Sequence, residues 1–302
     1  MEETVYHIPA LLRECIDGLA INPGGVYVDA TFGGGGHSGA IMEHLDDSGR
    51  LFGFDQDIDA YQNRIDDPRF TFVHSNFAYL TNFLRYYGVT QVDGILADLG
   101  VSFHHFDSAE RGFSFRADSP LDMRMNQAAE HNAAWVIENY SEEQLADVLY
   151  LYGELHQAKK MANAIASARK SVPIKTTGQL AEVVRPLIKP AAAKKELAQV
   201  FQALRIEVNG EISALRQLLE SSLRVLRPGG RMVVLTYHSL EDRMVKNFFR
   251  SGNVEGHVEK DFFGRVSAPF TAVNSRVIVA SDDEVTRNPR ARSAKLRIAQ
   301  KN

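Results

Sequence analysis

Short apolar segments alternate with segments of helical periodicity over the first hundred residues. Runs rich in β-branched and aromatic residues predict four strands, and apolar residues at three- and four-residue spacing predict helices around them. The predicted strands are 26–30, 51–55, 70–74 and 92–98, and the predicted helices are 7–19, 37–45, 58–65 and 77–87. This alternation predicts an α/β fold built on a doubly wound parallel sheet.

The alternation stops after residue 98 and resumes with a strand at 231–236. A structureless loop of that length is implausible in a compact domain. The interval has a helical pattern of its own, with capping boxes at 141–144 and 176–179. We therefore predict an inserted α-helical domain at 108–204, within a sheet domain formed by 1–107 and 205–302.

The C-terminal third is predicted to complete the sheet domain. A long helical stretch at 197–226 has a predicted break at Asn209-Gly210. Ser239 is the predicted N-cap of the helix after the 231–236 strand, with Asp242 at the capping-box position. Two further strands, 277–280 and 295–299, are predicted to pair at the end of the chain.

Four consecutive glycines connect the first predicted strand to the first helix of the sheet: Gly33, Gly34, Gly35 and Gly36. Such a run is useful where the backbone must adopt positive φ or pass close to a ligand. A glycine loop that opens a helix also presents N–H groups to a polar or acidic ligand. We interpret it as a nucleotide-type cofactor loop rather than a flexible surface loop, because apolar patterns abut it on both sides.

Three of the predicted strands have a carboxylate as their last or penultimate residue: Asp29, Asp55 and Asp98. Ligands of open α/β sheets bind at the carboxyl ends of the strands. A single aspartate there often only caps the next helix. Three of them around a glycine loop favour a binding site.

Two cofactor classes fit this loop. The spacing Gly34-x-Gly36-x-x-Gly39, with Asp55 later in the chain, matches the dinucleotide fingerprint. The same layout is typical of class I S-adenosylmethionine (SAM) methyltransferases, which add an acidic residue at the end of the first strand, where Asp29 stands. A carboxylate beside the loop suits the cationic groups of SAM better than a pyrophosphate. The pattern therefore favours SAM, with a dinucleotide-dependent oxidoreductase as the rival.

Composition limits the remaining classes. The chain has 302 residues, 44% of them hydrophobic and 24% charged, and a net charge of −4, which is ordinary for a soluble globular protein. Cys15 is the only cysteine, so no intrachain disulfide is possible and a reducing cytoplasm fits. We find no signal-peptide pattern at residues 1–5 and no apolar run of about 18 residues, so we expect a cytoplasmic protein without a membrane span.

Charge is uneven within the predicted insertion. Between His156 and Arg205 there are ten lysines and arginines but only two acidic residues, Glu182 and Glu196. Such a local excess suits phosphate contacts, which supply affinity without reading sequence. Upstream, 111–115 and 121–125 mix arginines with aromatic residues, a combination that can hold phosphates and stack bases. Arg111, Phe113 and Arg124 are our candidate RNA contacts there, and a packed connecting segment is the alternative.

Several long motifs together resemble one family closely, the bacterial 16S ribosomal RNA cytosine-N4 methyltransferases. The matching stretches run along nearly the whole chain: 28–33 with 35–37, 98–102, 111–115, 121–125, 201–206, 238–242 and 288–293. The resemblance implies a class I, Rossmann-like methyltransferase sheet with a helical insertion. It also implies SAM as methyl donor and N4 of a decoding-centre cytidine in 16S rRNA as acceptor.

The resemblance also assigns site residues. The expected cofactor contacts are the glycine loop, His37, Asp55, Tyr79, Asp98 and His105, the last standing where the family usually has glutamine. From its place at the end of a strand, Asp98 is the expected catalytic residue, as acceptor of an N4–H bond. His238 and Ser239, at the end of the 231–236 strand, are candidate lining residues of the active site, and a structural role for His238 is the alternative. No metal ligands are expected.

The alternative function from another class is a regulator that binds SAM or RNA without catalysis. The presence of Asp98 and of the loop glycines, which catalysis needs, disfavours it. The expected partner is the small ribosomal subunit. The oligomeric state stays open, with a homodimer as one alternative.

Overall fold

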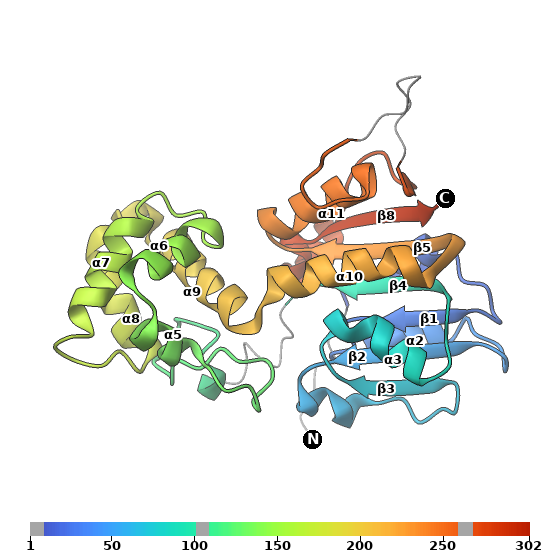
Figure 1. Ribbon diagram of the computed structural model, residues 1–302, viewed down its shortest axis with the longest axis horizontal. Coiled ribbons are helices and arrows are strands. Elements are labelled where there is room, and N and C mark those ends of the chain that lie inside the picture. Colours follow the sequence, from blue (N-terminus) through green and yellow to red (C-terminus); the bar gives the residue numbers. More distant parts are fainter. Residues whose placement is uncertain (1–8, 101–108, 259–267) are drawn as a thin grey trace. The chain divides into compact units, whose positions relative to one another are not determined.

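The computed structural model describes residues 9–100, 109–258 and 268–302. The chain divides into two compact units, one formed by Met1–Gly100 with Ile212–Asn302 and the other by Val101–Glu211. The first is a sheet unit and the second is a helical unit, and each is described by itself (Figure 1).

The sheet unit is built on a mostly parallel sheet. Its strands run in the order β3-β2-β1-β4-β5-β8-β6, and β7 pairs with β8. The first five strands are parallel, whereas β8 pairs antiparallel with β5, β6 and β7. The strands are β1 (Val26–Asp29), β2 (Arg50–Asp55), β3 (Phe70–His74), β4 (Val92–Asp98), β5 (Leu226–Thr236), β6 (Phe270–Ala272), β7 (Ile278–Val279) and β8 (Lys295–Lys301).

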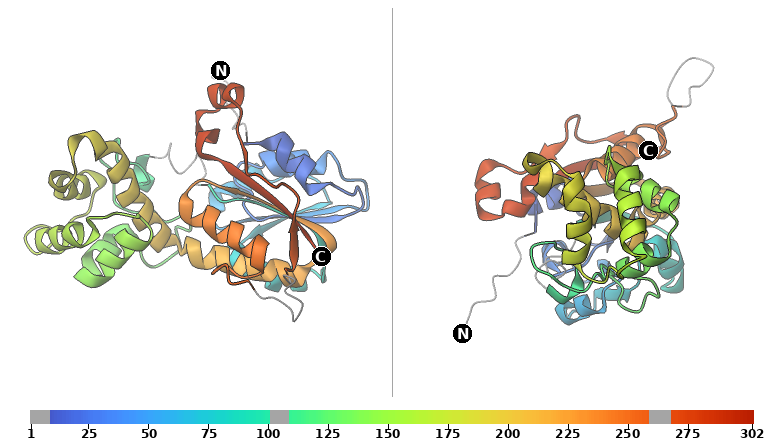
Figure 2. Two further views of the ribbon diagram at one scale, coloured as in Figure 1. Left: turned by 90° about the horizontal axis from the view of Figure 1, so that it is seen from above. Right: turned by 90° about the vertical axis from the view of Figure 1, so that its left-hand side faces the viewer.

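Helices cover both faces of this sheet, because inward side chains of the strands alternate between two apolar clusters. One cluster joins the strands to α3 (Leu80–Tyr86), α10 (Glu211–Val225) and α11 (Ser239–Ser251). The other joins them to α1 (Leu12–Leu19) and α2 (Gly36–Met42). In the left view of Figure 2 the blue and the orange helices lie on opposite sides of the sheet. The predicted doubly wound α/β fold is confirmed.

The helical unit has a separate core. Its helices are α5 (Ala133–Asn139), α6 (Glu142–Leu151), α7 (Ala158–Ala168), α8 (Thr177–Val184) and α9 (Ala193–Asn209), with 3-10 turns at Ala109–Arg111, Arg185–Leu187 and Pro190–Ala192. All five helices contribute buried side chains to one apolar cluster. The capping boxes predicted at Ser141 and Thr176 are both present.

The unit boundaries differ from the predicted 107/108 and 204/205. The helix α9 continues to Asn209 and ends at Gly210, whose φ of 58° stops the helix. Leu204 is fully buried in the core of the helical unit, and Val208 packs against that core. The residues after 204 therefore continue the helical unit as far as Glu211. The break predicted at Asn209-Gly210 is confirmed.

Several elements differ from the prediction. The predicted helix at 58–65 is a 3-10 helix, η1 (Ile58–Asn63), and the predicted helix at 77–87 begins with the 3-10 turn η2 (Phe77–Tyr79). The short strand β6 was not predicted. Two short C-terminal helices, α12 (Asp282–Arg287) and η6 (Pro289–Ser293), lie between β7 and β8.

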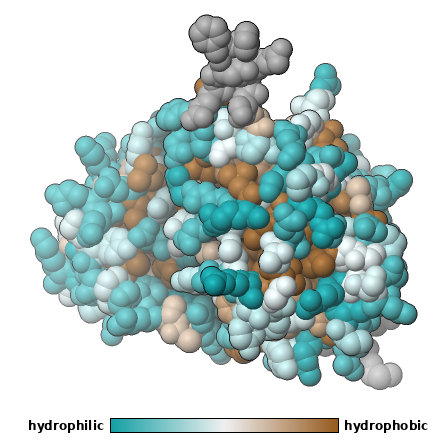
Figure 3. All heavy atoms as spheres, turned by 45° about the vertical axis from the view of Figure 1, so that its right-hand side comes forward, coloured by the Kyte–Doolittle hydropathy of each residue, from teal (hydrophilic) through white to brown (hydrophobic). Residues whose placement is uncertain are grey.

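In the part of the chain that the structure describes, no helix combines the length and the apolar character of a membrane span. Hydrophilic side chains cover much of the face shown in Figure 3, with hydrophobic ones between them.

Candidate functional site

The three predicted carboxylates meet at one edge of the sheet. The strand β1 lies between β2 and β4, and all three run parallel. Asp29, Asp55 and Asp98 are the last residues of these strands. The α/β topology therefore brings together side chains that are far apart in the sequence.

Asp29 is fully buried and is bonded to the loop and to the start of α2. Its carboxylate accepts hydrogen bonds from the Thr31 N–H at 3.0 Å and from the Ser38 hydroxyl at 2.7 Å. Burial raises the pKa of Asp29, while the nearby His37 ring and these hydrogen bonds act against that rise. Asp29 thus ties the loop to α2, and its effect on the cationic groups of SAM stays a prediction.

The glycine loop needs its glycines for two separate reasons. Gly33 and Gly35 have φ values of 51° and 77°, a region that side chains disfavour. A Cβ atom at Gly34 would meet nothing within 4 Å among the described residues, so a ligand has room to approach the backbone there. The N–H groups of Gly33 and Gly35 are already bonded within the protein, to Asp55 and to the Phe32 carbonyl. The four glycines are therefore better explained by the close approach of a ligand to the loop backbone than by donation of N–H groups to that ligand.

Asp55 holds the loop in place. Its Oδ2 atom accepts the Gly33 N–H at 2.8 Å, and its Oδ1 atom accepts the Asp57 N–H at the same distance. The side chain of Asn63 donates to the Gly33 carbonyl at 3.1 Å. Asp55 thus links β2, the glycine loop and the start of η1, a contact that sequence spacing did not reveal.

Asp98 combines a buried position with a partly exposed carboxylate. Its side chain is 22% exposed, and its Oδ1 atom is buried without a hydrogen-bond partner among the described residues. Its backbone N–H donates to the Thr31 hydroxyl at 2.7 Å, which joins the ends of β4 and β1. Burial raises the pKa of Asp98, while His37, the Tyr237 hydroxyl and the Gly100 N–H stabilise the ionised form. An orphaned buried oxygen suits a polar ligand group that the protein does not supply.

Two further predicted cofactor contacts have different outcomes. Tyr79 ends η2 directly after β3 and is 56% exposed, so its ring is available to a ligand. His105 lies outside the described residues.

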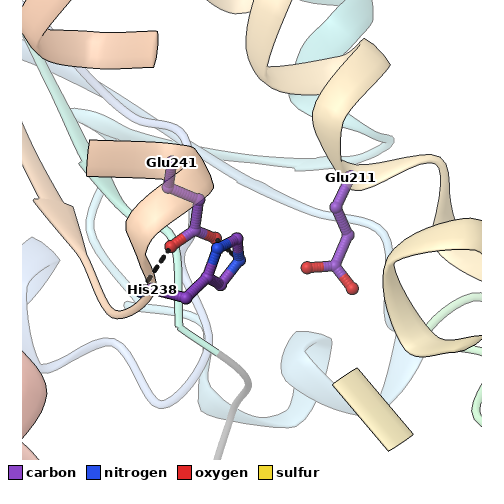
Figure 4. Close-up of side chains that lie close together, drawn as sticks. All are labelled: Glu211, His238 and Glu241. Atoms are coloured by element: carbon purple, nitrogen blue, oxygen red, sulfur yellow. Dashed lines mark hydrogen bonds and ion pairs between the residues drawn. The ribbon is translucent and has the colours of Figure 1, made fainter. Parts of the chain in front are cut away.

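His238 lies where β5 passes into α11. It is the N-cap of that helix, and its Nε2 atom lies 3.0 Å from Oε1 of Glu241 (Figure 4). The other oxygen of Glu241 accepts the Tyr237 N–H at 3.0 Å. The predicted cap was Ser239 with Asp242, which is wrong by one residue. The Asp242 carboxylate instead accepts a hydrogen bond at 2.7 Å from the guanidinium of Arg297, which lies in β8.

The three candidate RNA contacts upstream of α5 are engaged inside the helical unit. The Arg111 guanidinium donates to the carbonyls of Arg124 and Met125, and Arg124 pairs with Asp122 at 2.7 Å. Phe113 is only 6% exposed and belongs to the apolar core, so its ring is not available to a base. These contacts favour the alternative, a packed connecting segment, over a surface that holds RNA.

Most of the basic excess of the insertion is exposed. Eight of its ten basic side chains lie on the surface: Lys159, Lys160, Lys170, Lys175, Arg185, Lys189, Lys194 and Lys195. The other two have structural partners. Arg205 forms a two-bond pair with Glu211, and Arg169 donates to the Ile137 carbonyl.

Sequence reasoning missed Thr31, Ser38 and Tyr237. Each fixes a carboxylate of the site, but single Ser, Thr and Tyr residues carry no spacing signal. Their proximity to Asp29 and Asp98 arises only from the folded sheet.

Comparison with known proteins agrees with the motifs. The model of the MraW methylase family matches residues 4–302. Three relatives are named ribosomal RNA small subunit methyltransferase H. That of Phocaeicola vulgatus is 61% identical over 98% of both chains, that of Bacteroides fragilis is 60% identical over 99% of both, and that of Azobacteroides pseudotrichonymphae is 52% identical over 98% of this chain and 97% of its own. The resemblance drawn from the motifs is confirmed, and the chain belongs to the MraW methylase family.

Proposed function

We propose that the protein is a SAM-dependent methyltransferase that methylates N4 of a decoding-centre cytidine in 16S rRNA. One observation carries the proposal: a member of a methylase family has a glycine loop, Asp55 and Asp98 at one sheet edge, and a buried oxygen of Asp98 has no hydrogen-bond partner among the described residues. The relatives' printed names, which specify RNA of the small ribosomal subunit, support the choice of substrate.

The residues at this edge fit SAM. The open space at Gly34 admits a ligand against the loop backbone, and Asp55 and the exposed Tyr79 flank it as candidates for the ribose hydroxyls and the adenine ring. Asp98 offers a carboxylate to the cationic part of the ligand. Gly33, Gly35, Gly36 and His37 shape the loop around it, and His105 stays a proposed contact. SAM, when bound, supplies an activated methyl group with a good leaving group.

The protein's contribution to the chemistry is alignment and proton removal. Cytosine N4 is a weak nucleophile because its lone pair is conjugated into the ring. A carboxylate that accepts an N4–H bond favours the positive charge that develops on nitrogen and then takes the proton. Asp98 has the position and the free oxygen for this role. His238, whose Nε2 atom lies 3.0 Å from Oε1 of Glu241 at the end of β5, is a proposed lining residue.

The helical unit is the proposed contact to RNA phosphates through its exposed lysines and arginines. A target cytidine in a duplex would have to leave the stack, since N4 is otherwise paired. The proposed setting is the cytoplasm, with the small ribosomal subunit as partner. A homodimer is the assembly to be tested by sedimentation.

The decisive experiment is nucleoside mass spectrometry of small-subunit RNA from cells with and without the gene. We expect N4-methylated cytidine to disappear from one decoding-centre position in the deletion and to return with the wild-type gene. Unchanged nucleosides would reject the proposed substrate. Thermal shift with SAM, S-adenosylhomocysteine (SAH) and NAD separates the rivals: stabilisation by NAD alone would favour an oxidoreductase, and SAM binding without methylation would favour a regulator.

A further inference from the structure

His37 is a buried histidine at the start of α2 whose two ring nitrogens have different neighbours. Nε2 lies 3.2 Å from the backbone carbonyl oxygen of Ala10, and Nδ1 lies 3.9 Å from Oδ2 of Asp98. A carbonyl oxygen only accepts hydrogen bonds, so Nε2 carries the hydrogen of the neutral ring. Nδ1 of the neutral ring therefore presents a lone pair to Asp98.

Among the residues that the structure describes, the groups that face Asp98 leave His37 as a base within its reach. They come from five parts of the sheet unit: His37 from α2, Tyr237 after β5, Glu241 from α11, Asp29 from β1 and Cys15 from α1. Burial raises the pKa of Tyr237 and that of Cys15 well above their usual values, so both keep their protons at neutral pH. Asp29 already accepts hydrogen bonds from Thr31 and Ser38, and Glu241 accepts them from the backbone N–H groups of Tyr237 and His238.

We propose that His37 is the final proton acceptor of the methyl transfer: Asp98 removes a proton from N4, and that proton then passes to Nδ1 of His37. This inference rests on the proposed function. The N4–C bond forms as the S–C bond breaks, the electron pair of the broken bond stays on sulfur, and N4 gives up one proton. His37 acts through Asp98 and does not touch the substrate. The 3.9 Å separation must shorten for the transfer, as catalytic contacts often do when substrate binds.

Electrostatics gives this relay a direction. Without a ligand, a cationic His37 ring stabilises the Asp98 carboxylate. A sulfonium beside Asp98 disfavours this second cation, so with SAM bound the ring is neutral and able to accept a proton. After transfer the sulfur is neutral, and an imidazolium beside the Asp98 carboxylate is favoured by their opposite charges. The positive charge lost at sulfur thus reappears at His37, within the same small site.

The test is calorimetry on the full chain with SAM and with SAH, each in two buffers of different ionisation enthalpy near neutral pH. We expect the wild type to take up a larger fraction of a proton with SAH than with SAM. His37→Gln, whose side-chain amide keeps a donor for the Ala10 carbonyl, should lose this difference. His44→Gln is the matched control, because His44 is an exposed α2-proximal histidine bonded to the Ala40 carbonyl, and it should keep the difference. An equal difference in His37→Gln and in the wild type would overturn the proposal.

A second measurement uses the wild type alone, so it tests the proposal even if His37→Gln fails to fold or to bind SAH. In the wild type labelled with 15N-histidine, the His37 ring is assigned through its contact with Ala10. We expect its Nδ1 resonance to move toward the protonated position when SAH replaces SAM, and an unchanged resonance would refute the relay. Neither measurement needs RNA. A wild type that shows the proton uptake but leaves 16S RNA unmethylated would therefore count against the proposed substrate and not against the His37–Asp98 pair.

Discussion

Replacing Asp55 with alanine removes two hydrogen bonds at once, and the structure allows the effect on cofactor binding to be worked out. Both carboxylate oxygens of Asp55 accept backbone N–H groups at 2.8 Å, one from Gly33 and one from Asp57. A hydrogen bond to a charged group contributes about 1.5–3 kcal/mol. Without the Gly33 bond, the loop loses its tie to β2, so the fraction of protein with a binding-ready loop falls.

We expect Asp55→Ala to weaken SAM binding by about 1.5–3 kcal/mol, which is roughly 10- to 150-fold in Kd. Any ribose contact made by the same carboxylate adds to this loss. Asp55→Asn keeps one acceptor oxygen and should fall between the wild type and the alanine variant. Asp47→Ala, at an exposed turn position in the same unit, is the control and should bind as the wild type does.

Isothermal titration calorimetry measures the Kd values, and hydrogen exchange of the ligand-free protein reports the loop. If Asp55 anchors the loop, the Gly33 amide exchanges faster in Asp55→Ala before any ligand is added. An Asp55→Ala protein with wild-type affinity would refute the reasoning. Weak binding with unchanged exchange at Gly33 would assign the loss to a direct ligand contact instead.

Asp98→Asn keeps the shape of the side chain and removes its charge, so the single-turnover methylation rate at saturating SAM should fall by ~10²–10⁴; a rate within a few-fold of the wild type would show that alignment alone drives the reaction. Burial raises the pKa of Asp98, and the ionised form is the active one. As pH is lowered, the wild-type methylation rate should therefore begin to fall at a higher pH than the pKa of an ordinary aspartate would give, which a pH–rate profile measures. Replacing Arg185, Lys194 and Lys195 with glutamine should make the salt dependence of RNA binding shallower by roughly 2–3 in log–log slope and leave SAM affinity unchanged; an identical slope would make these side chains merely solubilising. Gly53→Ala places a Cβ atom 2.8 Å from the rings of Phe32 and Phe70 and should cost ~1–3 kcal/mol of unfolding free energy in urea, whereas Gly39→Ala, with open space around its Cβ, should be neutral or slightly stabilising.

The strands were the most predictable part of the fold. β3 and β4 begin and end where their apolar runs do, and β1 and β2 differ from the prediction by one residue at one end. The apolar pattern of a strand predicts its position well, because a shift by one residue would turn all its apolar side chains to the other face of the sheet. The capping boxes at Ser141 and Thr176 were predictable for a similar reason, since the Ser/Thr and Gln positions are fixed relative to each other.

The roles of individual site residues were less predictable. Spacing placed Asp29, Asp55 and Asp98 at one edge correctly, but it did not reveal that Asp29 is saturated by Thr31 and Ser38. Composition placed Phe113 among RNA contacts, although the fold buries its ring. Both outcomes depend on which side chains the tertiary structure brings together, and a linear pattern does not contain that information.

The position of the helical unit in the chain has a consequence for folding. β4 and β5 are neighbours in the sheet, yet the whole of Val101–Glu211 lies between them in sequence. Closing so long a loop in an unfolded chain carries a large entropic cost and slows the pairing. The helical unit, in which α7 packs on α6 and α8 and α9 packs back on α5 and α6, can form early and bring its two ends toward a fixed separation. We therefore expect helical signals to appear in refolding before β4–β5 pairing, and mutations that destabilise the helical core to delay completion of the sheet.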